Sequence, residues 1–336
     1  MRIGYVGTNY TLGTKTSTFR LAAFTPERAR ETAERNLEGT LSCLKWNAER
    51  GIGFFRISSG IIPFASHPVS EGWDWRSELR PIFEEIGAFA NLHNMRLGTH
   101  PGQYTLLNSP RESVVQAAIA ELGYHADMLD EMGVPDDARL QIHVGGAYES
   151  REDSLARWVA AYKILPEPIR RRLAVENDER LFGLVDCLYL NDQTGVPVIF
   201  DVFHHSLKNE SETLPDAYRQ VEPTWGNCPM QIDYSSQNAD RRFGAHTDSI
   251  VPDDFRAFLV DVPRTADVML EIKDKETSAM HALAILDPAR GPYVPPEPEL
   301  KRKPKPLRKK KAVPDDGGAS EAVVEDEVET GEVEAE

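Results

Sequence analysis

Short apolar runs that each end on a His, Glu or Asp recur along this chain. The most complete example runs from Val196 to Asp201 and is followed at once by His204 and His205. A continuous run of Val, Ile and Phe is typical of a parallel strand buried on both faces, whose last residue stands at the carboxyl edge of the sheet. Four further runs end in the same way, at His100, His143, Glu176 and Glu271. The pattern predicts one sheet that gathers ionisable side chains along one edge.

The alternation of elements predicts an α/β fold, a single (β/α)8 TIM barrel. Strand-like runs lie at 2–7, 53–58, 96–100, 140–143, 173–176, 196–201, 230–234 and 267–272. Helix-like segments lie between them at 26–50, 75–94, 111–132, 150–165, 180–191, 212–221 and 252–260, and a last one ends near Leu286. Eight strand-then-helix units are typical of a closed parallel barrel, whose site lies at the carboxyl ends of the strands. We assign the barrel, as the candidate catalytic domain, to residues 1–290.

Residues 291–336 are predicted to form a disordered, charged tail. Segment 301–311 holds eight Lys/Arg and no acid, whereas the acidic stretch 315–336 holds ten Asp/Glu and no Lys/Arg. Such blocks of like charge bury too little apolar surface to pack. Two interpretations stay open, a solvated tail and an arm that binds phosphates.

The chain has the composition of a reduced, cytoplasmic protein. Cys43, Cys187 and Cys228 stand far apart and form no Cys-x-x-Cys pair, so neither a disulfide framework nor a thiolate zinc site is indicated. No apolar run approaches membrane-spanning length, so we expect no membrane contact. The formal net charge of −16 does not exclude an anionic substrate, because local patches and bound cations decide such contacts.

The ionisable residues at the predicted strand ends indicate a metal centre. They are His100, His143, Glu176, Asp201, His204, His246 and Glu271. Burying so many ionisable groups together without cations would be very costly. Mixed imidazole and carboxylate ligands suit zinc or manganese, and more than four of them in one place suit two or three divalent ions.

Seven motifs between residue 2 and about residue 285 carry a family resemblance. They are Tyr5-x-x-x-Asn9, His100-Pro-Gly-Gln103-Tyr104, Glu176-Asn177-Asp178, Phe200-Asp201-x-x-His204-His205, Asp233-Tyr-Ser-Ser-Gln237, Gly244-Ala-His246 and Glu271-x-Lys273-x-Lys275. In combination they resemble the UV damage endonucleases, divalent-metal barrels similar to apurinic-site endonuclease IV. That family nicks DNA immediately 5′ to ultraviolet photoproducts. The resemblance implies a DNA repair endonuclease, a phosphodiester hydrolase acting on damaged double-stranded DNA at the nucleoid, and we expect a monomer.

The resemblance also implies roles for individual residues. The seven strand-end ligands would bind the metals, and Glu176 would bridge two ions at the catalytic centre. Gln103 and Tyr104 would push into the duplex at the lesion. Tyr5 and Asn9 would contact the splayed nucleotides.

Several polar residues near the predicted mouth are further candidates. Lys273 is a candidate donor to the scissile phosphate, and we count His67, on the loop after the second strand, with the catalytic candidates. Arg241 and Arg242 are candidates for holding the DNA backbone. The alternative for these cations is an ordinary exposed charge on a loop or at a helix start.

The seventh predicted strand departs from the family pattern. Some members carry Lys-x-His there, with the lysine modified as a metal ligand, whereas this chain has Gln231-Ile-Asp233. Asp233 can serve as an oxygen ligand, but Gln231 cannot become a carbamate, and we expect its amide to be hydrogen-bonded within the mouth. The change counts against a full third metal. It favours manganese, with magnesium and zinc as alternatives.

Two other functions fit the same residues. A metal-dependent sugar isomerase or epimerase uses the same barrel, with the ions polarising a ketose, but it needs no exposed Gln-Tyr pair. A lesion-binding protein that has lost turnover through the strand-seven changes is the second alternative.

Overall fold

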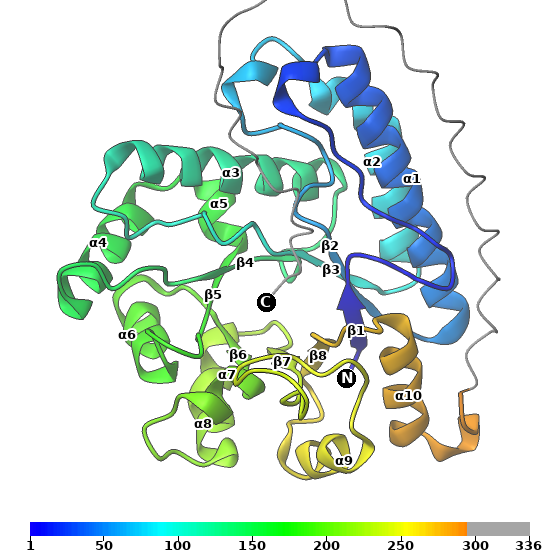
Figure 1. The fold of residues 1–336 in the computed structure, drawn as a ribbon, viewed down its shortest axis with the longest axis vertical. Coiled ribbons are helices and arrows are strands. Elements are labelled where there is room, and N and C mark those ends of the chain that lie inside the picture. Colours follow the sequence, from blue (N-terminus) through cyan, green and yellow to red (C-terminus); the bar gives the residue numbers. More distant parts are fainter. Residues whose placement is uncertain (294–336) are drawn as a thin grey trace, which may run out of the picture. The chain divides into compact units, whose positions relative to one another are not determined.

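The computed structural model describes residues 1–293, and their strands form a closed parallel barrel surrounded by helices (Figure 1). Each strand pairs with the next one in sequence, and β8 pairs with β1. The strands are β1 (Ile3–Val6), β2 (Phe54–Ile57), β3 (Arg96–Thr99), β4 (Arg139–His143), β5 (Leu173–Glu176), β6 (Val198–Asp201), β7 (Gln231–Tyr234) and β8 (Asp267–Leu270). The TIM-barrel prediction is confirmed. The predicted tail, apart from residues 291–293, lies outside the described residues.

The helices of the described residues follow the strands in the expected order. They are α1 (Pro26–Arg50), α2 (Trp75–Leu92), α3 (Glu112–Glu131), α4 (Arg151–Ile164), α5 (Glu167–Arg172), α6 (Leu184–Thr194), α7 (Val202–Leu207), α8 (Leu214–Val221), α9 (Pro252–Asp261) and α10 (Glu276–Leu286). Short 3-10 turns are η1 (Leu21–Ala23), η2 (Pro68–Ser70), η3 (Glu222–Trp225) and η4 (Pro288–Arg290). None of these helices is long and apolar enough to span a bilayer.

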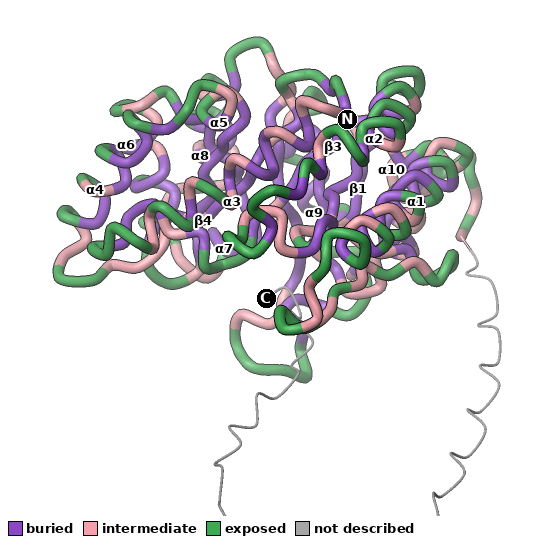
Figure 2. The backbone as a smooth tube through the Cα atoms, turned by 90° about the horizontal axis from the view of Figure 1, so that it is seen from above, coloured by how far each residue is buried: buried purple, intermediate pink, exposed green. Residues whose placement is uncertain are grey.

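Helix α1 shows how local sequence sets the helix boundaries. The Thr25 side chain caps its first turn, and Gly51 ends it in the left-handed conformation at φ 75°. Ala33, Leu37 and Leu41 recur every four residues and are all buried, so one stripe of the helix packs inward. Figure 2 shows this burial pattern over the whole ring, with buried strands inside and exposed outer helix surfaces.

Two helices at the mouth differ from the sequence prediction. The helix after β5 was expected from residue 180 but begins at Leu184, because the Asp178 carboxylate accepts hydrogen bonds from the backbone amides of Arg180, Leu181 and Phe182. Helix α7 was not predicted and starts directly after β6. Its first turn is capped by Asp201, which accepts a hydrogen bond from the backbone amide of His204 at 2.7 Å.

The two ends of the barrel interior have opposite characters. Near the amino ends of the strands, Arg96 donates to Asp267 at 3.2 Å and to the Pro229 carbonyl at 3.0 Å. The Arg96 guanidinium lies over the Phe54 ring, 5.1 Å from its centre, and Gly4 must lack a side chain because a Cβ there would lie 2.5 Å from the Phe54 carbonyl oxygen. The interior is therefore closed at that end. The His and carboxylate residues collect at the other, carboxyl end.

Candidate functional site

The predicted ligands meet at the carboxyl ends of the strands. Their ligand atoms form three groups, within each of which all atoms lie within 4.8 Å of one another. The groups are His100, His143 and Glu176; Glu176, Asp201 and His204; and Glu176, Asp233 and Glu271. Glu176, the last residue of β5, belongs to all three groups. His246, in the loop after β7, lies beside the third group, with its Nδ1 3.8 Å from Glu271 Oε2.

Three of the imidazoles are oriented by backbone carbonyls. Nδ1 of His100 lies 3.1 Å from the Pro101 carbonyl oxygen, and Nδ1 of His204 lies 3.1 Å from that of Asn177. Nδ1 of His246 lies 2.8 Å from the carbonyl oxygen of Glu271. A carbonyl only accepts, so Nδ1 donates in each case and a neutral ring keeps its lone pair on Nε2. This tautomer is the one that orients histidine as a metal ligand.

Glu176 lies at the electrostatic centre of the mouth. Its Oε2 is 3.4 Å from His100 Nε2 and 3.6 Å from His143 Nε2, and its Oε1 is 3.4 Å from His204 Nδ1. Burial alone would raise the pKa of Glu176, but the neighbouring imidazoles hold it well below its usual value. Burial likewise opposes the charged form of His204, yet Asp201 and Glu176 raise its pKa to about 11. The carboxylates are thus balanced by protons that a cation would displace.

Three buried atoms at this mouth have no hydrogen-bond partner. They are Glu176 Oε1, Asp201 Oδ2 and His143 Nδ1. Two of the three are carboxylate oxygens, and a buried, unpartnered carboxylate oxygen is costly and needs an explanation. His204 Nδ1 lies 3.6 Å from Asp201 Oδ2, which is too long for a hydrogen bond. The donor set of the first two groups therefore fits divalent ions.

The third group contains a cation that sequence reasoning missed. The guanidinium of Arg56, on β2, pairs with both Asp233 and Glu271. Gln141 Nε2 donates to Asp233 Oδ2 and to Glu176 Oε2, each at 2.6 Å. Gln231 Nε2 donates to Asp233 Oδ1 at 3.0 Å, so the expected hydrogen bonding of its amide is confirmed. The sequence feature that could have revealed Arg56 is its position within the otherwise apolar strand Phe54–Ile57.

Gln103 and Tyr104, the residues predicted to push into the duplex, lie at the tip of a tight turn. Thr105 N donates to the Gly102 carbonyl at 2.9 Å, which places Gln103 and Tyr104 at the two central positions. Both are exposed, and Tyr104 is 80% exposed although it is aromatic. Pro101 and Thr105 are buried and anchor the turn. The turn therefore presents this pair to solvent next to the ligand His100.

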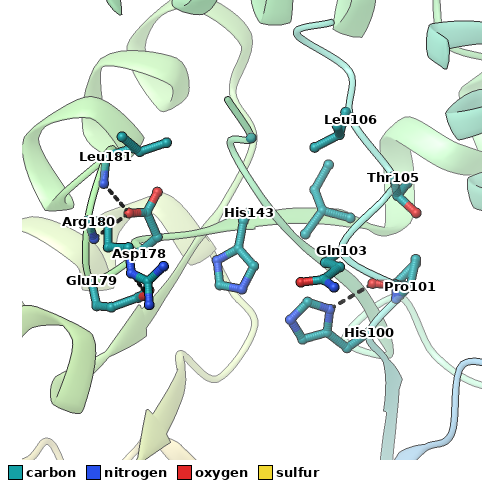
Figure 3. Close-up of a pocket in the computed structure, with 13 residues that line it drawn as sticks. His100, Pro101, Gln103, Thr105, Leu106, His143, Asp178, Glu179, Arg180 and Leu181 are labelled. Carbon is teal, nitrogen blue, oxygen red and sulfur yellow. Dashed lines mark hydrogen bonds and ion pairs between the residues drawn. The ribbon is translucent and has the colours of Figure 1, made fainter. Parts of the chain in front are cut away.

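A pocket of about 220 Å³ separates this turn from the loop after β5. Figure 3 shows His143 between the turn that carries Gln103 and the loop that carries Asp178 and Arg180, with His100 beside Gln103. Arg180 is largely exposed and pairs with Glu179 at 2.9 Å. A cation beside the imidazoles is suited to a phosphate, and sequence reasoning missed it.

Tyr5 and Asn9, predicted to contact nucleotides, form a hydrogen-bonded pair inside the structure. Both are fully buried. The Tyr5 hydroxyl donates to Asn47 Oδ1 and accepts from Asn9 Nδ2, each at 2.9 Å, and burial raises the pKa of Tyr5. Asn9 Oδ1 accepts from the backbone amide of Leu12, so the pair braces the loop after β1. Both side chains are closed off from solvent in this structure, and their contact with splayed nucleotides stays a prediction.

The remaining candidates lie on surrounding loops. His67 is exposed, and its Nδ1 accepts a hydrogen bond from the backbone amide of Val69 at 3.0 Å. Asp248 forms ion pairs with two of the candidate cations. Its Oδ1 lies 3.5 Å from Lys273 Nζ and 4.0 Å from Arg241 Nη2. Arg242 is exposed beside Arg241.

Comparisons with known proteins agree with this geometry. A family model described as UV-endonuclease UvdE matches residues 1–290. The UV DNA damage endonuclease of Clostridium perfringens (strain 13 / Type A) is 33% identical over 291 residues, which cover 84% of this chain and 70% of that protein. The one from Bacillus thuringiensis subsp. konkukian (strain 97-27) is 31% identical over 305 residues, which cover 87% of this chain and 96% of that protein.

Solved structures give the same result. The crystal structure of SacUVDE matches with a TM-score of 0.83 and 44% identity, covering 86% of this chain and 99% of that chain. A D-psicose 3-epimerase from Clostridium cellulolyticum H10 matches with a TM-score of 0.53 and 14% identity over 85% of this chain and 98% of that one, a likeness of fold alone. The family match over the barrel and the identity to its curated relatives lead to one conclusion: this chain belongs to the UvdE family of UV DNA damage endonucleases.

Proposed function

We propose that this protein is a divalent-metal-dependent endonuclease that nicks DNA immediately 5′ to ultraviolet photoproducts. One observation carries the proposal. Glu176 joins two groups of His and carboxylate ligands whose buried oxygens lack partners, and an exposed Gln103-Tyr104 turn lies beside them. A multi-metal mouth suits phosphodiester hydrolysis, and an exposed aromatic beside it suits a distorted duplex.

The residues that would hold the ions are those of the first two groups. His100 and His143 would share Glu176 with Asp201 and His204. Divalent ions bound there would supply an activated water nucleophile and neutralise charge on the scissile phosphate and on the leaving 3′-oxygen. The mixture of imidazole nitrogens and carboxylate oxygens favours manganese, with magnesium and zinc as alternatives.

The surrounding residues fix the ligands in place before substrate arrives. Asn177 Nδ2 donates to the Asp201 carbonyl at 3.0 Å, and Asn177 Oδ1 accepts from the Asp201 backbone amide at 2.9 Å. Gln141 holds Oε2 of Glu176. Such outer partners keep the ligand geometry constant, which lowers the reorganisation needed during reaction.

The exposed turn and the loop cations would engage the DNA. Tyr104 would insert at the lesion, where a photoproduct has already weakened base stacking and lowered the cost of opening the duplex. Arg180, Lys273 and Arg241 surround the mouth and would hold phosphates, which position the strand without reading its sequence.

Glu176 would serve as the ligand shared between the ions, so its loss should remove incision.

The test uses an end-labelled duplex that carries one photoproduct. The protein is incubated with it in the presence of manganese or of a chelator, and the product length is read at single-nucleotide resolution. The expected result is one product that ends immediately 5′ to the lesion, formed only with metal. Equal cutting of an undamaged duplex, or a nick at any other position, would overturn the proposal.

A further inference from the structure

We propose that the guanidinium of Arg56 takes the place of a third divalent ion in the mouth, so that the site holds two ions and one permanent organic cation. The inference rests on the proposed function, since it concerns the same ligand groups. It assigns Asp233, predicted from sequence as a metal ligand, to Arg56 instead.

The three ligand groups differ in what already occupies them. In the first two, Glu176 Oε1 and Asp201 Oδ2 are buried and have no hydrogen-bond partner. In the third, both oxygens of Asp233 are engaged. Oδ1 accepts from Gln231, whereas Oδ2 pairs with Arg56 and accepts from Gln141. The first two groups thus have oxygens available for an ion, whereas Asp233, the carboxylate that belongs only to the third group, has none.

Arg56 is built into the barrel as a fixed member of this group. Its side chain is only 3% exposed, and its two terminal nitrogens reach different carboxylates, Asp233 on β7 and Glu271 after β8. One of them also donates to Gln141 Oε1 at 2.7 Å. The planar fork of arginine suits such divergent pairing, and it remains charged at all ordinary pH values.

The charges agree with this assignment. Arg56 pairs with both Asp233 and Glu271, so these two carboxylates already have a cation as their partner. A divalent ion at the same place would lie within hydrogen-bond range of the positive guanidinium. Like-charge repulsion in a buried site therefore excludes that ion as long as Arg56 is present.

Gln141 and Gln231 also oppose binding of a third divalent ion. Gln231 Nε2 donates to Gln141 Oε1 at 2.9 Å as well as to Asp233, and Gln141 Nε2 bridges Asp233 and Glu176. Amide hydrogens that point at carboxylate oxygens occupy the lone pairs that a metal would need. The residues that distinguish strand seven of this chain therefore belong to one network with Arg56.

The consequence for function is a positioning role for Arg56. It holds Glu271, whose backbone carbonyl in turn orients the imidazole of His246. Unlike an ion, a guanidinium cannot be removed by a chelator. The part of the mouth around Asp233 and Glu271 should therefore keep its geometry in metal-free protein.

The test counts manganese ions per folded chain. Equilibrium dialysis of the full-length protein against excess manganese, followed by elemental analysis, should give two ions for the wild type. Arg56→Gln removes the cation and should raise the count to three, with a larger gain in melting temperature on adding manganese. Arg56→Lys, which keeps the charge, should remain at two. Arg151→Gln is the matched control, because Arg151 also pairs with a carboxylate, Asp186, but outside the mouth.

A second variant decides the question even if Arg56→Gln does not fold. Loss of a true ligand should weaken metal binding by more than the roughly ten- to hundredfold that mutation of an outer partner typically costs. Asp233→Asn should instead leave the count at two ions per chain, because Asp233 is not a ligand of either ion. Three ions in the wild type, a folded Arg56→Gln that stays at two, or the loss of an ion in Asp233→Asn would overturn this inference alone. A wild type that binds no ion would overturn the proposed metal dependence itself.

Discussion

Replacing Glu176 by Gln should remove incision while leaving the barrel folded. Glu176 is common to all three ligand groups, and its two oxygens face three imidazoles at 3.4 to 3.6 Å. The amide keeps the size of the side chain but removes its charge and one oxygen. If each of two ions loses roughly ten- to a hundredfold in affinity, the combined loss is about 10²- to 10⁴-fold. At about 1.36 kcal/mol per tenfold, that corresponds to about 2.7 to 5.4 kcal/mol of lost stabilisation.

The assay for this variant separates metal binding from folding. Manganese affinity is measured by calorimetry, incision is measured in single turnover on a photoproduct duplex, and thermal unfolding reports the fold. Glu167→Gln, an exposed change on α5 away from the mouth, is the control and should match the wild type. A folded Glu176→Gln variant that binds two ions and nicks at the wild-type rate would refute the reasoning.

Three further perturbations test separate parts of the site. Tyr104→Ala should lose stacking worth about 1 to 3 kcal/mol, roughly tenfold to a hundredfold in incision of a damaged duplex. The loss should shrink on a bubble that carries the same lesion, and metal content should not change; equal losses on both substrates would contradict a wedge. His204 stays protonated up to a pKa of about 11 in metal-free protein, so an ion must displace its proton. Manganese affinity should therefore rise between pH 6 and pH 9 with proton release, measured by calorimetry in buffers of different ionisation enthalpy, and a flat profile would contradict this balance. Tyr5→Phe leaves Asn47 and Asn9 without their shared hydroxyl and should cost about 1 to 3 kcal/mol in chemical unfolding while leaving DNA affinity unchanged; weaker DNA binding at full stability would support the predicted contact with nucleotides.

The sequence predicted the ligands because they follow a local pattern. His143, Glu176 and Asp201 each end an apolar strand, and the parallel barrel brings such ends together whatever the connecting helices do. The Gln103-Tyr104 turn was also local, since Pro101 and Gly102 restrict the backbone just before it.

The sequence could not show contacts that depend on distant partners. Tyr5 lies in a four-residue strand that is buried on nearly every position, so no alternation in the sequence shows which way its ring faces. Arg56 and Asp233 are 177 residues apart, and only closure of the barrel brings them into contact. The sequence therefore indicated Asp233 as a metal ligand but could not show its pairing with a guanidinium.

The most direct test of the account is nicking of supercoiled plasmid by the full-length protein, with irradiated and undamaged plasmid compared in the presence and absence of manganese. We expect conversion to nicked circles only for irradiated plasmid with manganese, and not with Glu176→Gln. Equal nicking of both plasmids, or nicking of irradiated plasmid that persists in chelator, would contradict metal-dependent incision at ultraviolet damage.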